Sequence, residues 1–128
     1  MERRSFLAAS ALLGLMGTAS ASAAADPARP LYGLIGKMKA VPGQRDALIS
    51  AILEGSASMP GCLSYIVAKD ADDADAIWIT EVWDSEASHD ASLQLPAVQA
   101  SIAKAKDLVA SMETGVVTTP VGGIGLKG

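Results

Sequence analysis

The chain has 128 residues, 50% of them hydrophobic and 19% charged, and its formal net charge is −4 at pH 7. An acidic chain is repelled by the phosphates of nucleic acid and by anionic membrane surfaces, so neither is an expected partner. The single cysteine, Cys62, excludes an internal disulfide. One cysteine and one histidine, His89, match no metal-ligand spacing, so we expect no bound metal.

The first 25 residues have the layout of a cleavable secretory signal. Arg3 and Arg4 form a basic start that resembles a twin-arginine export signal, and an apolar run at 6–16 and a stretch of small residues follow. The apolar run is shorter than the ~20 residues needed to span a bilayer, which argues against an uncleaved anchor. We therefore expect a signal peptide at 1–25, a short linker at 26–30, export to the periplasm or the medium, and no membrane contact after cleavage.

The rest of the chain fits a single domain at 31–121, followed by a glycine-rich tail at 122–128. Apolar and polar residues alternate over 31–41, which predicts a strand with one buried face. After a Pro-Gly step, apolar residues recur at helical spacing and predict a helix of about four turns that ends at the Met-Pro-Gly sequence of 59–61. The apolar stripe of this helix consists of Leu48, Ile49, Ile52 and Leu53.

Two further strands are predicted at 62–69 and 76–83, and the second is rich in β-branched and aromatic residues. The segment between them is acidic and has no periodicity, which indicates a solvated loop that joins the two strands as a hairpin. The acidic residues of this loop are Asp70, Asp72, Asp73 and Asp75.

The last third of the domain contains two predicted helices and a strand. Ser85 can cap a helix that extends to the Leu95-Pro96 step, and Pro96 can open the next helix. A last strand is predicted at 112–121. One side of the second helix is expected to face the core through Val98, Ile102, Ala105 and Val109.

The predicted element order is β-α-β-β-α-β, with the second helix broken at Pro96, and this order is typical of a ferredoxin-like α+β sandwich. A sheet of this kind has helices on one face and leaves the other face bare. Because a bare apolar face is unfavourable in water, we expect a second copy of the chain to cover it and form a homodimer.

Three segments, in their order and spacing, resemble the antibiotic biosynthesis monooxygenase family, including its quinol monooxygenase branch. They are PGQRDAL at 42–48, PGCLSY at 60–65 and EVWDSEASHDASLQLP at 81–96, and the resemblance covers nearly all of 31–121. It implies a dimeric α/β barrel, in which two sheets pack face to face, with a pocket between sheet and helices in each subunit.

The resemblance also implies chemistry without metal or flavin. In such enzymes a reduced aromatic, a quinol or an anthrone, is deprotonated and passes an electron directly to dioxygen, while the protein supplies orientation, a base and an apolar pocket. We therefore expect a small aromatic substrate, dioxygen and no cofactor. Members often carry a histidine where this chain has Ser92, which leaves His89 as the imidazole available here.

Five residues form the expected site. His89 is the candidate general base because histidine ordinarily titrates near neutrality, and a solvent-facing position is the alternative. Tyr65 is the second catalytic candidate, because its hydroxyl can hydrogen-bond a phenol, and a structural role is the alternative. Glu81 and Trp83 point to one side of their strand and, with Ser92, are the expected substrate-binding residues. Packing is the alternative for Trp83, and a buried Glu81 would need a partner.

Three functions are compatible with these observations. The leading hypothesis is a cofactor-independent monooxygenase that oxidises a small electron-rich aromatic of the quinol or anthrone type. The alternative is a non-catalytic dimeric module that binds an apolar ligand, which the serine at position 92 favours. A structural module without a ligand is the third.

Overall fold

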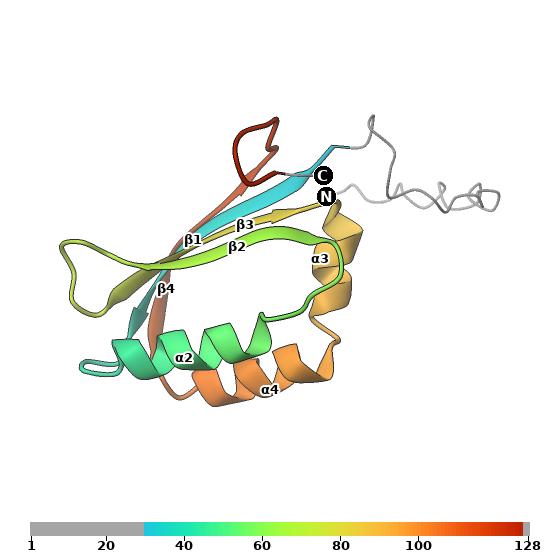
Figure 1. Ribbon diagram of the computed structural model, residues 1–128. Helices are drawn as coiled ribbons and strands as arrows, with labels where there is room; N and C mark the ends of the chain where they lie inside the picture. The colour runs from blue at the N-terminus through green and yellow to red at the C-terminus, as the bar shows by residue number, and fades with distance from the viewer. Residues whose placement is uncertain (1–29, 127–128) are drawn as a thin grey trace, which may run out of the picture.

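The computed structural model describes residues 30–126, in which four strands and three helices form a sheet with helices on one side (Figure 1). This is a ferredoxin-like α+β fold in the predicted element order. The predicted signal peptide at 1–25 lies outside the described residues. Within 30–126, no helix is long and apolar enough to cross a membrane. The elements are β1 (Tyr32–Ala40), α2 (Arg45–Gly55), β2 (Cys62–Lys69), β3 (Ala76–Trp83), α3 (Glu86–Ser92), α4 (Pro96–Ala105) and β4 (Val109–Thr118).

The strands lie in the order β2-β3-β1-β4, and each neighbouring pair is antiparallel. In this register Tyr32 lies opposite Trp83, and Glu81 lies opposite Tyr65. Because residues directly opposite each other point to the same face, these four side chains gather at one end of the helix-covered face.

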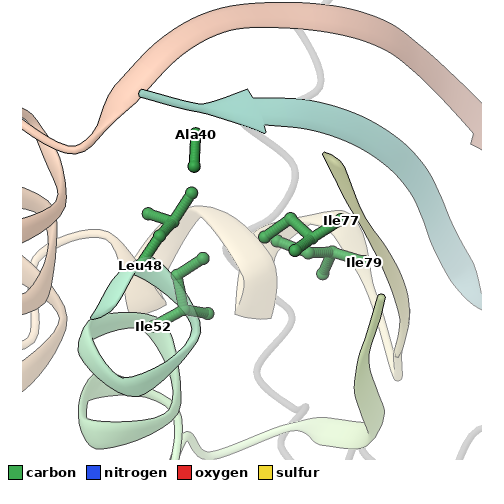
Figure 2. Packing of buried hydrophobic residues seen from close by; sticks show 5 residues of the cluster. All are labelled: Ala40, Leu48, Ile52, Ile77 and Ile79. Atoms are coloured by element: carbon green, nitrogen blue, oxygen red, sulfur yellow. The ribbon is translucent and has the colours of Figure 1, made fainter. Parts of the chain in front are cut away.

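The hydrophobic core lies toward the other end of that face. Leu48 and Ile52 of α2 pack against Ile77 and Ile79 of β3, with Ala40 of β1 beside them (Figure 2). Leu48 and Ile77 are fully buried. The pairing follows from spacing, since residues four apart share a helix face and residues two apart share a strand face.

The predicted bounds of strands β2 and β3 are confirmed, but two helices end earlier than predicted. Helix α2 stops at Gly55, where a Cβ would clash with the Ser101 side chain of α4, and Leu53 is exposed rather than part of the core stripe. Helix α3 stops at Ser92, three residues before the predicted end at Leu95.

The predicted boundary between the last helix and the last strand is wrong. Val109 belongs to β4, which pairs it with Ala40 of β1, and β4 ends at Thr118. Helix α4 has no buried residue, and Ile102 is about half exposed. A long-range strand pairing therefore overrides the helical spacing that the sequence showed locally.

The acidic segment forms the predicted hairpin, but its first aspartate is not solvated as expected. Asp70 accepts a hydrogen bond from Trp78 Nε1 at 2.8 Å, and its carboxylate lies 3.7 Å from Lys37 Nζ. Asp73 forms an ion pair with Lys39 at 3.0 Å. These contacts fix the loop against the sheet.

Candidate active site

A cavity of about 550 Å³ lies between the sheet and helices α2, α3 and α4. This volume lies within the range of small-molecule binding sites. Its wall includes seven polar residues, which are Ser56, Tyr65, Glu81, His89, Ser92, Ser101 and Lys106. Most of the remaining wall is apolar and includes Met38, Ile52, Met59, Ile79, Trp83, Val98, Ile102, Val109 and Met112.

Helix α3 carries His89 into this cavity, and the chain before it fixes where the helix starts. Ser85 is the predicted N-cap, and its Oγ accepts the backbone N–H of Ser88 at 3.1 Å. Gly61 has a φ of +85°, and a Cβ there would lie 2.5 Å from the Ser88 side chain. The backbone N–H of Asp84 donates to the carbonyl of Gly61 at 2.9 Å. A glycine is therefore required where β2 begins, so that α3 can approach it.

His89 lies in the cavity wall, with most of its side chain shielded from solvent. Its side chain is 19% exposed and its ring lies 5.4 Å from the ring of Trp83, with an edge-on angle of 83°. The ring of Tyr32 lies at the same centroid distance, tilted by 45°. His89 Nδ1 is 3.1 Å from Asp90 Oδ1. When Nδ1 carries the hydrogen and donates it to Asp90, Nε2 is an acceptor suited to a general base.

Glu81 and Trp83 lie on the same strand face, as predicted, and bond each other. Trp83 Nε1 donates to Glu81 Oε1 at 2.9 Å, and Trp83 is only 1% exposed. Within residues 30–126, no basic nitrogen lies at salt-bridge distance from Glu81. The carboxylate therefore satisfies the buried indole N–H and keeps acceptor capacity for another donor.

Tyr65 lies opposite Glu81 on the neighbouring strand. Burial raises the pKa of the Tyr65 hydroxyl well above its ordinary value of 10.0, and the negative charge of Glu81 raises it further. At neutral pH Tyr65 is thus a neutral phenol that can donate or accept a hydrogen bond. Burial also raises the pKa of the Cys62 thiol, which argues against a reactive thiolate.

Ser92 is buried, and its hydroxyl donates to the backbone carbonyl of His89 at 2.6 Å. The hydroxyl hydrogen is therefore used in a hydrogen bond within the helix, and only the oxygen lone pairs of Ser92 remain for a ligand.

The structure brings all five predicted residues to one cavity. Sequence reasoning missed the contact between Asp90 and His89, although their adjacency in sequence was a usable signal. In the described range 30–126, no three His, Cys, Asp or Glu side chains are grouped closely enough to hold a metal ion.

Comparison with known proteins places this chain in a family. The sequence profile of antibiotic biosynthesis monooxygenases matches residues 31–104. A protein from Chloroflexus aurantiacus, designated a candidate antibiotic biosynthesis monooxygenase, is 62% identical over 76% of this chain and 99% of its own, with a TM-score of 0.74.

More distant structures share the fold. A Nitrosomonas europaea protein of the same designation is 17% identical over 71% of this chain and 90% of its own, with a TM-score of 0.66. A Pseudomonas aeruginosa protein is 21% identical over 73% of this chain and 96% of its own, with a TM-score of 0.63. None of the curated proteins matches the chain. By its profile match and its close structural relative, the chain belongs to the antibiotic biosynthesis monooxygenase family.

Proposed function

We propose that this protein is a cofactor-independent monooxygenase that oxidises a small electron-rich aromatic, of the quinol or anthrone type, with dioxygen. One observation carries the proposal: a largely apolar cavity whose wall includes an imidazole, a carboxylate and a neutral phenol. Apolar walls suit an aromatic ring and exclude water, and the polar groups can orient its hydroxyl.

In this proposal His89 is the general base that deprotonates the substrate. Its Nε2 accepts the proton of the substrate, and Asp90 holds the ring orientation through Nδ1, at 3.1 Å. The deprotonated substrate gives one electron to dioxygen, and the resulting radicals combine to form a C–O bond. The O–O bond of the resulting peroxide then breaks, so that one oxygen atom stays in the product and the other leaves as water with two hydrogens of the substrate. The substrate is the reductant, so no other is required.

The direct test is oxygen uptake by chelator-treated, flavin-free protein with a panel of hydroquinones and anthrones. We expect uptake that depends on both protein and substrate, and one labelled oxygen atom per product molecule when isotopically labelled dioxygen is used. Uptake that is unchanged when the protein is heat-denatured would contradict the proposal.

A second candidate function is a non-catalytic module that binds an apolar ligand. The observation in its favour is Ser92, which offers no imidazole and whose hydroxyl hydrogen is committed to the carbonyl of His89. This function predicts a rise in melting temperature with aromatic ligands and no oxygen uptake from any of them.

The quaternary state that we propose is a homodimer formed through the sheet face opposite the helices. A row of side chains crosses all four strands on this face, because Ile66 pairs with Thr80, Thr80 with Ile35, and Ile35 with Val116. Ile66 is 58% exposed and Val116 is 47% exposed. A second sheet packed against this row removes that apolar surface from water.

Charge introduced into the row tests the dimer. Sedimentation at micromolar concentration should give a dimer for the wild type and a monomer for Ile66→Asp. Leu53→Asp is the matched control, because Leu53 is 49% exposed but lies on α2, away from the bare face, and this variant should remain dimeric. A wild-type monomer would remove the proposed interface.

We further propose that the protein is exported and acts outside the cytoplasm, as the sequence of residues 1–25 indicates. The mass of the protein in the periplasmic fraction should correspond to a chain that begins near Ala24 or Asp26. An intact Met1 in that fraction would contradict export by a cleaved signal.

A further inference from the structure

The hydrogen-bond donors around the site are largely used within the protein. Trp83 Nε1–H is donated to Glu81, and Ser92 Oγ–H is donated to the carbonyl of His89. Ser101, another residue of the wall, donates its hydroxyl hydrogen to the carbonyl of Ala51 at 2.7 Å. A ligand in the cavity therefore meets few free donors.

Acceptors, in contrast, remain available. Glu81 has a carboxylate oxygen that Trp83 does not occupy. His89 presents Nε2 as an acceptor when Nδ1–H is donated to Asp90. The Tyr65 hydroxyl can donate or accept a hydrogen bond, so it favours neither a donor nor an acceptor on the ligand.

Among the described residues of the wall, the one lysine is at the far end of the cavity. Lys106 lies three residues before Val109, which pairs with Ala40 at one end of β1. Glu81 pairs with Leu34 near the other end. At about 3.3 Å per residue, the two pairs are about 20 Å apart along the strand. Within residues 30–126, no ion pair joins Lys106 to Glu81.

From this arrangement we infer that Glu81 makes the cavity selective for the reduced, hydroxyl-bearing form of an aromatic ligand over its oxidised, carbonyl-bearing form. The inference rests on the proposed function, because that reaction turns hydroxyl groups into carbonyl groups. A hydroxyl donates to the carboxylate. A carbonyl cannot, and it places a second partial negative charge beside Glu81. The product is therefore bound more weakly than the substrate and is released.

Anaerobic binding to three ligands of similar shape tests the selectivity. They are naphthohydroquinone, its dimethyl ether and naphthoquinone, with dissociation constants measured by calorimetry in the absence of oxygen. Since a hydrogen bond to a charged group is lost, wild-type protein should bind the hydroquinone about 10-fold to 100-fold more tightly than either of the others. The ether separates the loss of the donor from the electrophilic chemistry of the quinone.

The variant Glu81→Gln locates the effect. Trp83 Nε1–H should hold the amide oxygen in place, which turns the amide NH₂ group toward the ligand. We expect Glu81→Gln to lose the preference for the hydroquinone and to bind naphthoquinone at least 10-fold more tightly than wild type does. Glu86→Gln is the matched control, because it removes the same charge from an exposed position on α3, and it should keep the wild-type preference.

Two results would overturn the inference: similar affinity of wild type for all three ligands, or an unchanged preference in Glu81→Gln. The wild-type comparison stands by itself if the variant does not fold. Failure of the proposed function gives a different pattern, in which wild type prefers the hydroquinone but consumes no oxygen with it. In that case the selectivity is confirmed and the monooxygenase assignment is wrong.

Discussion

Strand β3 carries two tryptophans on opposite faces, and the indole N–H of each donates to a carboxylate. Trp78 Nε1 lies 2.8 Å from Asp70 Oδ2, and Trp83 Nε1 lies 2.9 Å from Glu81 Oε1. Their surroundings differ. Asp70 also accepts two backbone N–H groups of its own loop, at 2.8 and 2.9 Å, and lies near Lys37. Glu81 has no basic partner within residues 30–126.

The difference shows how one pair of residue types serves two purposes. At Asp70 the acceptor positions are filled, and the bond from Trp78, followed by the backbone bonds, lowers the pKa of the carboxyl to about 2. The hydrogen bond from Trp78 to Asp70 fixes the hairpin loop against the sheet. Glu81 keeps acceptor capacity facing a cavity, which is what ligand recognition requires. The two pairs contain the same kinds of group, and what distinguishes the candidate active site from the hairpin is the number of acceptor positions that its carboxylate leaves unfilled.

The largest effect is expected at the cavity, from His89→Ala. Removal of a general base lowers turnover by about 100-fold to 10,000-fold, while circular dichroism should show an unchanged fold. The measurement is oxygen uptake with the best hydroquinone of the panel. Glu86→Ala, on the exposed side of the same helix, should retain wild-type turnover. Full activity of His89→Ala would reassign the proton step to Glu81 or to the substrate itself.

Truncation of the two tryptophans should lower the free energy of unfolding by different amounts at the cavity and at the hairpin. Trp83 is 1% exposed, so Trp83→Ala should lower the free energy of unfolding by about 3–5 kcal/mol. Trp78 is only partly buried, and Trp78→Ala should cost about 1–2 kcal/mol. Urea unfolding measures both. Equal losses would mean that the hairpin contributes as much stability as the buried wall of the cavity.

The hairpin and the cavity also differ in how much of their structure the sequence predicts. Alternation and capping are local signals, and they predicted the bounds of β2 and β3, the N-cap at Ser85 and the shared face of Glu81 and Trp83. The position of His89 between Trp83 and Tyr32 depends on pairing between β1 and β3, which are far apart in sequence. The start of β4 at Val109 was missed for the same reason.

The Asp70 carboxylate, whose acceptor positions are filled in the fold, predicts a loss of stability in acid. In the unfolded chain Asp70 titrates near its ordinary value of 3.8, and in the fold near 2. Between these values the unfolded state binds more protons, so the stabilisation is complete above about pH 5 and is lost as the pH falls toward 2. Melting temperatures of wild type should therefore fall over this range more steeply than those of Asp70→Asn. Parallel curves for the two proteins would show that Asp70 is not held as the structure indicates.

The smallest effect is expected for Tyr65→Phe, which keeps the ring and removes the hydroxyl. Burial and the charge of Glu81 raise the pKa of this phenol above its ordinary value of 10.0, so it stays neutral through the working range and can contribute a neutral hydrogen bond to substrate. Such a bond is worth about 1 kcal/mol, so kcat/KM should fall about fivefold. Catalysis by a phenolate would instead cost at least about 100-fold and would remove an alkaline limb from the pH profile.

The same variant has a second readout in stability. Above pH 10.0 the unfolded chain releases the Tyr65 proton while the fold retains it, so wild type loses stability as the pH rises further, and Tyr65→Phe lacks this contribution. Melting curves collected between about pH 9 and 11 should diverge in that direction. A fivefold loss in kcat/KM together with this divergence would place Tyr65 beside the substrate as a neutral hydrogen-bond partner of the substrate, leaving His89 as the base.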